Sequence, residues 1–489
     1  MRMSLLNAPE TEVNRLADFR KLIRNESVKL RHGKFIWIML ILMLIASVGL
    51  SALLGIGMRM LNSIDDEASY PLSEECDTEL QYWSDYAAYA EEEYVQEQVL
   101  FYTTLRSLGM TRSDWRYQTG AVRDYAGRKA QGLPGADELE QIIFANDHKG
   151  WYRMNIAEIE EIYAGNSPIQ ELYTTAERYC LENDVLPCDS DWRYAVACHM
   201  ETYLISQRNL EAHRDAGIRI SEESLEAAKN GYAIAAYQLE NNIPVNPMDS
   251  AGLLDSLVAI AMGGGEETVA SSQLWTSLFT GVSLISIVSL VGVVIAAGIV
   301  ANEFQKGTIK FLLITPARRW KILLAKYCTV LNVVFAMTIL LFAANLLFSI
   351  IFCGGQHLLL PEINATNGVI HTSSPFLRLI GRYLLELVGP IVSLTLAFAI
   401  SSLFRHSSAA TAISLCLLYI GNFVNQLLAM FGADWGRYLI FANMDFASIQ
   451  RGVNLYYRDQ SLTVAIIVIV LHMIVFLLTA FDAFDRREV

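Results

Sequence analysis

The stretch EFQKGTIKFLLITPARRWKILLAK, residues 303–326, decides how the rest of this chain is arranged. It carries six Lys/Arg and one acid, Glu303, and long apolar runs flank it on both sides. Because positive charges between membrane spans concentrate on the cytoplasmic side, we expect this stretch in the cytoplasm. Apolar residues recur at near-helical spacing around Pro316, and a proline disfavours helical geometry in the residue before it. We therefore predict two short helices with a break at Thr315–Pro316, and we call residues 302–326 the basic segment.

Composition and charge indicate a membrane protein with two differently charged parts. Of the 489 residues, 53% are hydrophobic, and several apolar runs are long enough for membrane-spanning helices. Residues 62–270 hold 38 Asp/Glu against 14 Lys/Arg, whereas the rest of the chain holds 13 acids and 23 bases. Such an asymmetry indicates that the two parts lie in different compartments. The net charge of −14 argues against a nucleic-acid partner.

The predicted fold is an all-α polytopic membrane protein. It has six transmembrane helices, an N-terminal amphipathic interfacial helix, and a large helical extracytoplasmic domain between the first two spans. The spans are predicted at residues 35–58, 273–301, 327–352, 382–404, 409–431 and 461–481. The other parts are the cytoplasmic N-terminus (1–34), the extracytoplasmic domain (59–272), the outer loop (353–381), the cytoplasmic turn (405–408), the outer segment (432–460) and the cytoplasmic tail (482–489). Six spans place both termini in the cytoplasm.

Weaker local signals complete this arrangement. Within residues 11–34, apolar residues at helical spacing alternate with Lys and Arg, which is typical of a basic helix in the headgroup layer. Gly132-Leu133-Pro134-Gly135 predicts a turn in the otherwise helical acidic region. In the fourth span, Pro390 predicts a kink. Arg382 and Glu386 are spaced for an i,i+4 ion pair.

The basic segment also resembles a known family. Its pattern Glu303-x3-Gly307-Thr308, followed by Leu312-Leu313, Pro316, Arg318 and Lys326, is similar to the first cytoplasmic loop of ABC-2 type transporter permeases. The resemblance covers residues 11–58 and 273–489, and in that family the loop docks on an ATPase subunit. It implies a docking segment shaped by Glu303, Gly307, Thr308 and Pro316, with Arg318 and Arg319 meeting acidic ATPase or lipid groups. The alternative is an ordinary positively charged loop whose Lys and Arg side chains reach the lipid headgroups.

Polar residues inside two spans are candidates for a translocation path. In the second span, hydroxyl side chains follow one side of the helix at Thr276, Thr280, Ser283, Ser286 and Ser289. In the fifth span, amide side chains share one face at Asn422, Asn425 and Gln426. Side chains this polar normally point to protein or water within a bilayer. Thr276, Thr280, Asn422, Asn425 and Gln426 are the predicted path residues, and close helix packing or interhelical hydrogen bonding is the alternative.

The sequence contains no motif for an energy source or for catalysis. It has no G-x-x-x-x-G-K-[ST] loop, no H-E-x-x-H and no G-x-S-x-G, so we predict no catalytic residue and no cofactor in this chain. ATP and magnesium would bind the partner ATPase. No metal site is predicted, because the spacing of Cys188, Cys198 and His199 matches no common zinc pattern. Disulfides among Cys76, Cys180, Cys188 and Cys198 are permitted outside the cell, but spacing does not decide the pairing.

These observations predict the permease subunit of an ATP-driven exporter of an amphipathic compound such as a peptide, a drug or a lipid-like molecule. The resemblance implies ATPase subunits and a second permease copy or a related permease as partners, with membrane lipid around them in a bacterial plasma membrane. The alternative is a membrane-anchored sensor or adaptor whose outer domain binds a ligand and signals through the basic segment without transport. A passive channel, which would conduct without nucleotide, is a third hypothesis.

Overall fold

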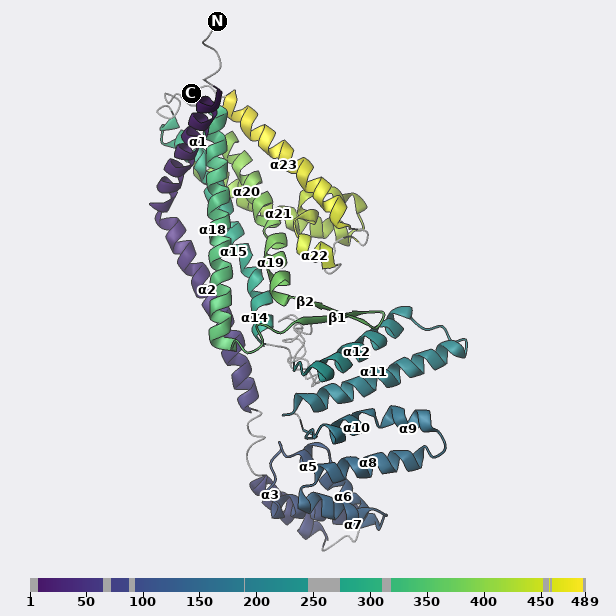
Figure 1. Ribbon diagram of the computed structural model, residues 1–489. Coiled ribbons are helices and arrows are strands. Elements are labelled where there is room, and N and C mark those ends of the chain that lie inside the picture. Colours follow the sequence, from purple (N-terminus) through teal and green to yellow (C-terminus); the bar gives the residue numbers. More distant parts are fainter. Residues whose placement is uncertain are drawn as a thin grey trace. The chain divides into compact units, whose positions relative to one another are not determined.

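The structure is a computed structural model that describes residues 8–64, 72–87, 93–188, 190–244, 273–309, 318–451, 457 and 460–486. The chain forms two compact units, which are labelled by element in Figure 1. The membrane unit comprises Met1–Leu54, Ser277–Gly354 and Phe376–Val489. The helical unit comprises Gly55–Thr276 and Gly355–Pro375.

The described residues contain six helical segments that are long and apolar enough to cross a membrane, as predicted. They are Lys34–Gly57, Leu274–Gln305, Arg319–Cys353, Pro375–Leu403, Ser407–Met430 and Leu462–Asp485. The first span is α2 (Lys34–Ile64), the third is α18 (Arg319–Cys353), the fifth is α21 (Ser407–Met430) and the sixth is α23 (Leu462–Asp485). The second span consists of α14 (Gln273–Gly281), η3 (Val282–Leu284), α15 (Ile285–Ile299) and α16 (Ala301–Gln305). The fourth span consists of α19 (Pro375–Glu386) and α20 (Val388–Leu403). The predicted N-terminal helix is α1 (Ala8–Arg31). The chain is therefore an α-helical polytopic membrane protein.

Helices α15 and α20 form the centre of the membrane unit. Both are predominantly apolar and largely buried, whereas only small shares of α2, α21 and α23 are buried. Burial of this kind is typical of the central helices of a bundle. Polar pairs join neighbouring spans, including Tyr327 OH to Thr395 Oγ1 (2.9 Å) and Ser277 Oγ to Ser349 Oγ (2.8 Å). Such interhelical hydrogen bonds stabilise bundles in which lipid provides no hydrophobic drive for association.

Two spans depart from regular helical geometry. The fourth span is interrupted between α19 and α20, which confirms the kink predicted at Pro390. A proline has no N–H for the carbonyl four residues earlier, which here belongs to Glu386. The second span passes through the 3₁₀ turn η3, where Ser283 Oγ donates to the Thr280 carbonyl at 2.7 Å. A short 3₁₀ stretch within a helix is often a hinge.

The predicted outer segment packs onto the membrane bundle. It forms η4 (Asp434–Tyr438), η5 (Ile440–Asn443) and α22 (Phe446–Arg451). Ile440 and Phe446 belong to an apolar cluster with Val392 of α20 and Ile469 of α23. The segment is thus part of the wall of the membrane unit.

The helical unit is built from consecutive helices, which Figure 1 shows as successive layers. They are α3 (Ser73–Ala87), α4 (Glu93–Ser107), α5 (Trp115–Gln118), α6 (Ala121–Gln131), α7 (Ala136–Ala145), α8 (His148–Ile162), α9 (Ser167–Tyr173), α10 (Thr175–Glu182), α11 (Trp192–Asp215) and α12 (Glu222–Asn241). The predicted turn at 132–135 separates α6 from α7, and both of its glycines have positive φ. Helix α8 joins two apolar cores, because Met154 packs in one and Tyr152 in the other.

The four cysteines of this region are free thiols in the structure. Cys76 and Cys188 lie in the first core, whereas Cys180 lies in the second. The pair Cys180–Cys188, which the sequence permitted, is therefore not joined.

A β-hairpin is an exception to the predicted all-α fold. Strands β1 (Glu362–Thr366) and β2 (Val369–Ser373) pair antiparallel within the helical unit. The connection is Asn367-Gly368, with φ values of 51° and 78°. Asn-Gly is the strongest short sequence signal for a two-residue hairpin turn, because both positions require positive φ. Gly368 N also donates to Asn230 Oδ1 of α12 at 2.8 Å, which fixes the turn to the helices.

The sequence Ser-Asp-Trp-Arg-Tyr occurs twice in the helical unit, at residues 113–117 and 190–194, and begins a helix each time. In the second copy, Asp191 Oδ1 accepts from the backbone N–H of Arg193 at 3.1 Å, and Oδ2 accepts from its guanidinium at 2.6 Å. Asp114 makes the same bonds to Arg116, at 3.0 and 2.6 Å. An aspartate here satisfies an orphan N–H and opposes the positive end of the helix dipole.

We predict that Asp191→Ala locally destabilises α11 by about 1 kcal/mol, the typical cost of removing an N-cap. Hydrogen exchange of the full-length protein should become faster in the first turn of α11. The matched control is Asp215→Ala, which removes the same charge at the other end of the helix, where an acid opposes the dipole. Equal exchange in the two variants would contradict the capping role.

Candidate functional site

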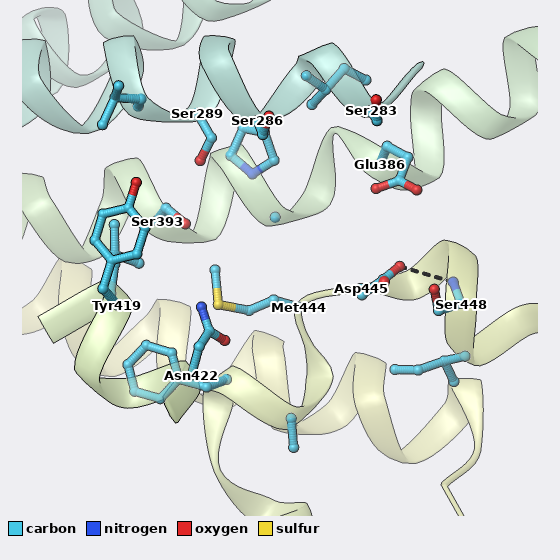
Figure 2. Close-up of a pocket in the computed structure, with 18 of the residues that line it drawn as sticks. Ser283, Ser286, Ser289, Glu386, Ser393, Tyr419, Asn422, Met444, Asp445 and Ser448 are labelled. Atoms are coloured by element: carbon cyan, nitrogen blue, oxygen red, sulfur yellow. Dashed lines mark hydrogen bonds between the residues drawn. The ribbon is translucent and has the colours of Figure 1, made fainter. Parts of the chain in front are cut away.

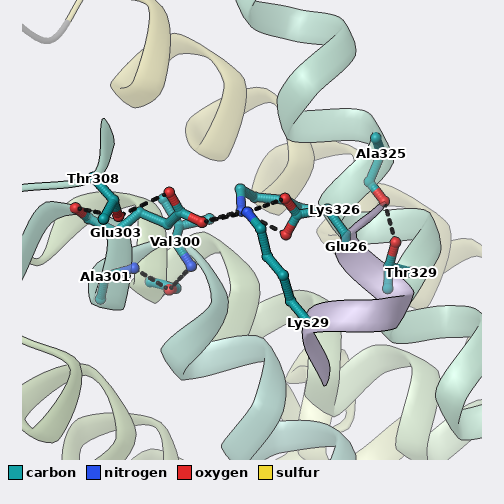
Figure 3. A network of polar contacts seen from close by, with 10 residues as sticks. Glu26, Lys29, Val300, Ala301, Glu303, Thr308, Ala325, Lys326 and Thr329 are labelled. Atoms are coloured by element: carbon teal, nitrogen blue, oxygen red, sulfur yellow. Dashed lines mark hydrogen bonds and ion pairs between the residues drawn. The ribbon is translucent and has the colours of Figure 1, made fainter. Parts of the chain in front are cut away.

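The two ends of the basic segment meet in a cluster of alternating charges, which Figure 3 shows. The charge cluster consists of Glu26 and Lys29 of α1, Glu303 of α16 and Lys326 of α18. Lys326 Nζ lies 2.8 Å from Glu26 Oε2 and 3.0 Å from Glu303 Oε1. Lys29 Nζ lies 2.8 Å from Glu26 Oε1 and 3.3 Å from Glu303 Oε1. Each acid therefore contacts both bases.

Burial makes this cluster costly to disturb. Lys326 is completely buried, and Glu26 is only 8% exposed. A buried charge is tolerated only when opposite charges and hydrogen bonds compensate for its lost hydration. Burial lowers the pKa of Lys29, but the carboxylates of Glu26 and Glu303 outweigh this effect and hold that pKa above its ordinary value. The cluster thus joins α1, α16 and α18 through charges that depend on one another.

Further contacts join the basic segment to the fifth and sixth spans. Gln305 Oε1 accepts from Ser407 N at 3.1 Å and from Ser407 Oγ at 2.8 Å, at the start of α21. Phe304 packs edge-on against Phe484 near the end of α23, with ring centroids 6.3 Å apart. Arg319 donates to the Asp485 carbonyl at 3.1 Å. Figure 1 shows α1 and this end of α23 at the same end of the membrane unit.

The second span is also fixed to the fourth at this end. Ser401 Oγ of α20 accepts from the backbone N–H groups of Val300 and Ala301, at 3.2 and 3.1 Å. These N–H groups lie where α15 ends and α16 begins. The hydroxyl of a neighbouring helix thus provides the hydrogen-bond acceptor for backbone groups at the interruption. The basic segment is therefore bonded to α1, α21 and α23, and the two residues just before it are bonded to α20.

The predicted docking residues have different surroundings. Thr308 Oγ1 donates to Glu303 Oε2 at 3.1 Å, and the exposed Gly307 has a φ of 69°, which favours glycine. Arg318 is exposed at the start of α18. Arg319 contacts α23 as described above. Pro316, and with it the predicted break at Thr315–Pro316, lies outside the described residues.

A polar cavity of about 460 Å³ lies within the membrane unit, and Figure 2 shows its side chains. Its hydroxyl groups come from Ser283, Ser286 and Ser289 of the second span, Ser393 of α20 and Ser448 of α22. Glu386, Tyr419, Asn422, Asp445 and Gln460 add further polar groups, while Leu290, Leu415, Phe441 and Met444 are among the apolar ones. This volume falls in the roughly 300–1,000 Å³ range of ligand pockets. Both helical interruptions, at η3 and before Pro390, contribute to the wall.

The structure separates the predicted path residues. Asn422 lines the polar cavity, whereas Thr276, Thr280, Asn425 and Gln426 are not among its lining residues. Asn425 is buried, and its Oδ1 accepts from the OH of Tyr457, which lies outside the helices, at 3.3 Å. Gln426 is exposed on α21. The serines at positions 283, 286 and 289, noted for their shared face, all reach the cavity.

Sequence reasoning missed several cavity residues. Glu386 forms the predicted pair with Arg382 at 3.1 Å, but its contribution to a cavity was not predicted. Asp445 and Ser448 lie in a segment that was interpreted as an outer connection. Glu26 gave no separate signal, because its partner Lys326 is 300 residues away.

Comparisons with known proteins agree with a membrane location. The family described as "Protein of unknown function (DUF2705)" matches residues 265–489, which include every residue that lines the polar cavity. YhcI of Bacillus subtilis (strain 168), described as an "Uncharacterized protein", is 33% identical over 267 residues, which cover 53% of this chain and 77% of YhcI. The chain belongs to the YhcI family.

A second relative of this YhcI-family chain is the "Uncharacterized membrane protein YdbK" of the same strain. It is 34% identical over 195 residues, which cover 40% of this chain and 75% of YdbK. No solved structure matches the chain.

We predict that Lys326→Met destabilises this YhcI-family protein by about 3–5 kcal/mol, the typical cost of removing one partner of a buried ion pair. The carboxylates of Glu26 and Glu303 would then have Lys29 as their remaining basic partner in the charge cluster. The measurement is the thermal unfolding midpoint of the purified protein in lipid nanodiscs. Lys306→Met is the matched control, since it removes the same charge from an exposed position in the basic segment. Similar midpoints for the two variants would show that the charge cluster contributes little to stability.

Proposed function

We propose that this chain is the permease subunit of an ATP-driven transporter of the ABC-2 type. In this proposal, a separate ATPase subunit binds the basic segment from the cytoplasm, and the pair exports an amphipathic compound across a bacterial plasma membrane. The observation that carries the proposal is the bonding of the basic segment to α1, α21 and α23 at one end of the membrane unit. A chain without a nucleotide-binding motif needs such a connection if a partner is to move it.

The contacts suggest how a displacement would travel. A push on the basic segment would act on α1 and α18 through the charge cluster. It would act on α20 through Ser401, on α21 through Ser407, and on α23 through Phe484 and Asp485. Packed elements joined by buried charges move as a body, so the displacement would reach the cavity walls rather than dissipate in a loop. The 3₁₀ turn η3 and the break before Pro390 are the points at which the spans would bend.

The docking residues have distinct roles in this proposal. Glu303 and Thr308 hold the beginning of the basic segment, and Gly307 permits the left-handed turn that follows α16. Arg318 presents an exposed positive charge to acidic ATPase or lipid groups. Pro316 would shape the same surface. ATP and magnesium would be held by the ATPase.

A second permease copy, or a related chain, would complete the membrane part. Helix α21 is mostly exposed, and Asn422 and Gln426 are polar residues on this exposed helix. Amide side chains facing lipid are unfavourable, whereas the same groups in a helix interface are stabilising. Asn422 lines the polar cavity, so Gln426 is the amide that pairing through α21 would shield.

We predict that an ATPase with a phosphate-binding loop co-purifies with the tagged chain from native membranes. Gly307→Val should reduce its recovery at least about tenfold, because a β-branched residue is strained at positive φ and would distort the docking turn. The measurement is quantitative mass spectrometry of the purified complex. Gly432→Val is a matched control, because Gly432 is also exposed and has a φ of 70°. It follows the C-terminal end of α21, whereas the N-terminal end of that helix contacts the basic segment.

Two outcomes would contradict the proposed function. One is recovery of the folded chain without any ATPase. The other is an equal ATPase yield from the Gly307→Val and Gly432→Val variants when both remain monodisperse.

A further inference from the structure

We propose that the polar cavity binds an organic cation with an apolar body, so that the cargo carries a positively charged amine or a similar group. This substrate class rests on the proposed function, because it treats the cavity as the place where cargo is held.

The lining residues carry negative charge only. Glu386 and Asp445 are the two ionisable acids among them, and no Lys, Arg or His of the described residues lines the cavity. Arg382 pairs with Glu386 at 3.1 Å and offsets part of this charge, which leaves the carboxylate of Asp445 in excess. In a setting of low dielectric constant, a net negative site attracts a cation more strongly than it would in water. An anion would meet repulsion from these carboxylates, and among the described residues that line the cavity no base would compensate its charge.

The two acids lie together at one end of the cavity. Figure 2 shows them near Ser283 and Ser448, whereas Tyr419, Ser289 and Ser393 lie toward the other end. In the second span, Ser283 is farther along the helix from Glu303 than Ser289 is. In the fourth span, Glu386 is farther than Ser393 from Ser401, which contacts the end of the second span. The acidic end of the cavity is therefore the end farther from Glu303. The cavity therefore has a charged end and a neutral end, and a ligand whose charge lies at one end would match this difference.

Asp445 is positioned to contact a ligand. Its Oδ1 accepts from the backbone N–H of Ser448 at 2.9 Å, which holds the carboxylate at the start of α22. A ligand ammonium could then donate to Oδ2 and to neighbouring serine oxygens. Charge-assisted bonds of this kind are shorter and stronger than bonds between neutral groups. They would replace the water that the cation loses on entering the membrane unit.

The remainder of the wall suits an apolar or aromatic body. Leu290, Leu415, Phe441 and Met444 provide apolar surface, and the ring of Tyr419 offers a face to an aromatic or cationic group. A bare divalent metal fits less well, because the described residues contain no cluster of three His, Cys, Asp or Glu side chains that could hold one. The combination therefore favours an organic cation over a metal ion.

The test measures binding of three small probes of similar shape to the full-length protein in nanodiscs without nucleotide. They are 1-naphthylmethylammonium, its neutral analogue 1-naphthylmethanol, and the anion 1-naphthoate. Equilibrium dialysis against empty nanodiscs corrects for partition into lipid. We expect the cation to bind at least about tenfold more tightly than the other two, a difference of about 1.4 kcal/mol.

The decisive variant is Asp445→Asn, whose side-chain carbonyl can still accept from Ser448 N. It should weaken binding of the cation about tenfold and leave binding of the alcohol unchanged. Asp434→Asn is the matched control, because Asp434 is an exposed acid of η4 that does not line the cavity. Glu386→Gln provides a second variant if Asp445→Asn lowers the unfolding midpoint.

Three results would overturn the inference: equal binding of cation and anion, equal effects of Asp445→Asn and Asp434→Asn, or no binding above that of empty nanodiscs. Failure of the proposed function would look different. The cation would then bind with the expected sensitivity to Asp445→Asn, but no ATPase would co-purify with the chain.

Discussion

The ammonium group of Lys326 is completely buried, and the structure depends on the two carboxylates that surround it. These carboxylates belong to Glu26 of α1 and Glu303 of α16, so keeping the charge buried also fixes two other elements to the third span. Lys29 contacts the same two acids from a more exposed position. Because every charge in this set has neighbours of opposite sign, the loss of one leaves the others uncompensated. The set holds together as one unit, and it joins the two ends of the basic segment to α1.

A cavity inside a bundle of apolar helices requires a place where close packing is interrupted. Here the interruptions are local departures from helical geometry in the second and fourth spans. The missing N–H of Pro390 ends regular helix near Glu386, and η3 redirects the second span near Ser283. Polar side chains at these points face the space that the interruptions open. The same residues therefore create the cavity and determine its chemistry.

Local patterns were sufficient for much of the fold and for part of the site. Length and hydropathy predicted the six spans, charge spacing predicted the Arg382–Glu386 pair, and Pro390 predicted the kink. The hairpin at Asn367-Gly368 was also within reach of sequence reasoning, because its turn residues are a strong local signal. It was missed because the surrounding loop was considered only as a connection between spans.

The sequence by itself determined which segments are apolar enough to enter a membrane and where their helices are interrupted, because both properties depend on neighbouring residues. Only the tertiary structure decided that Glu26 meets Lys326, that Asn425 is bonded to Tyr457 while Asn422 lines the cavity, and that Asp445 and Glu386 line the same cavity. These pairings join positions that are distant along the chain. Helical periodicity shows which residues share a face, but the packing order of the helices decides which faces meet.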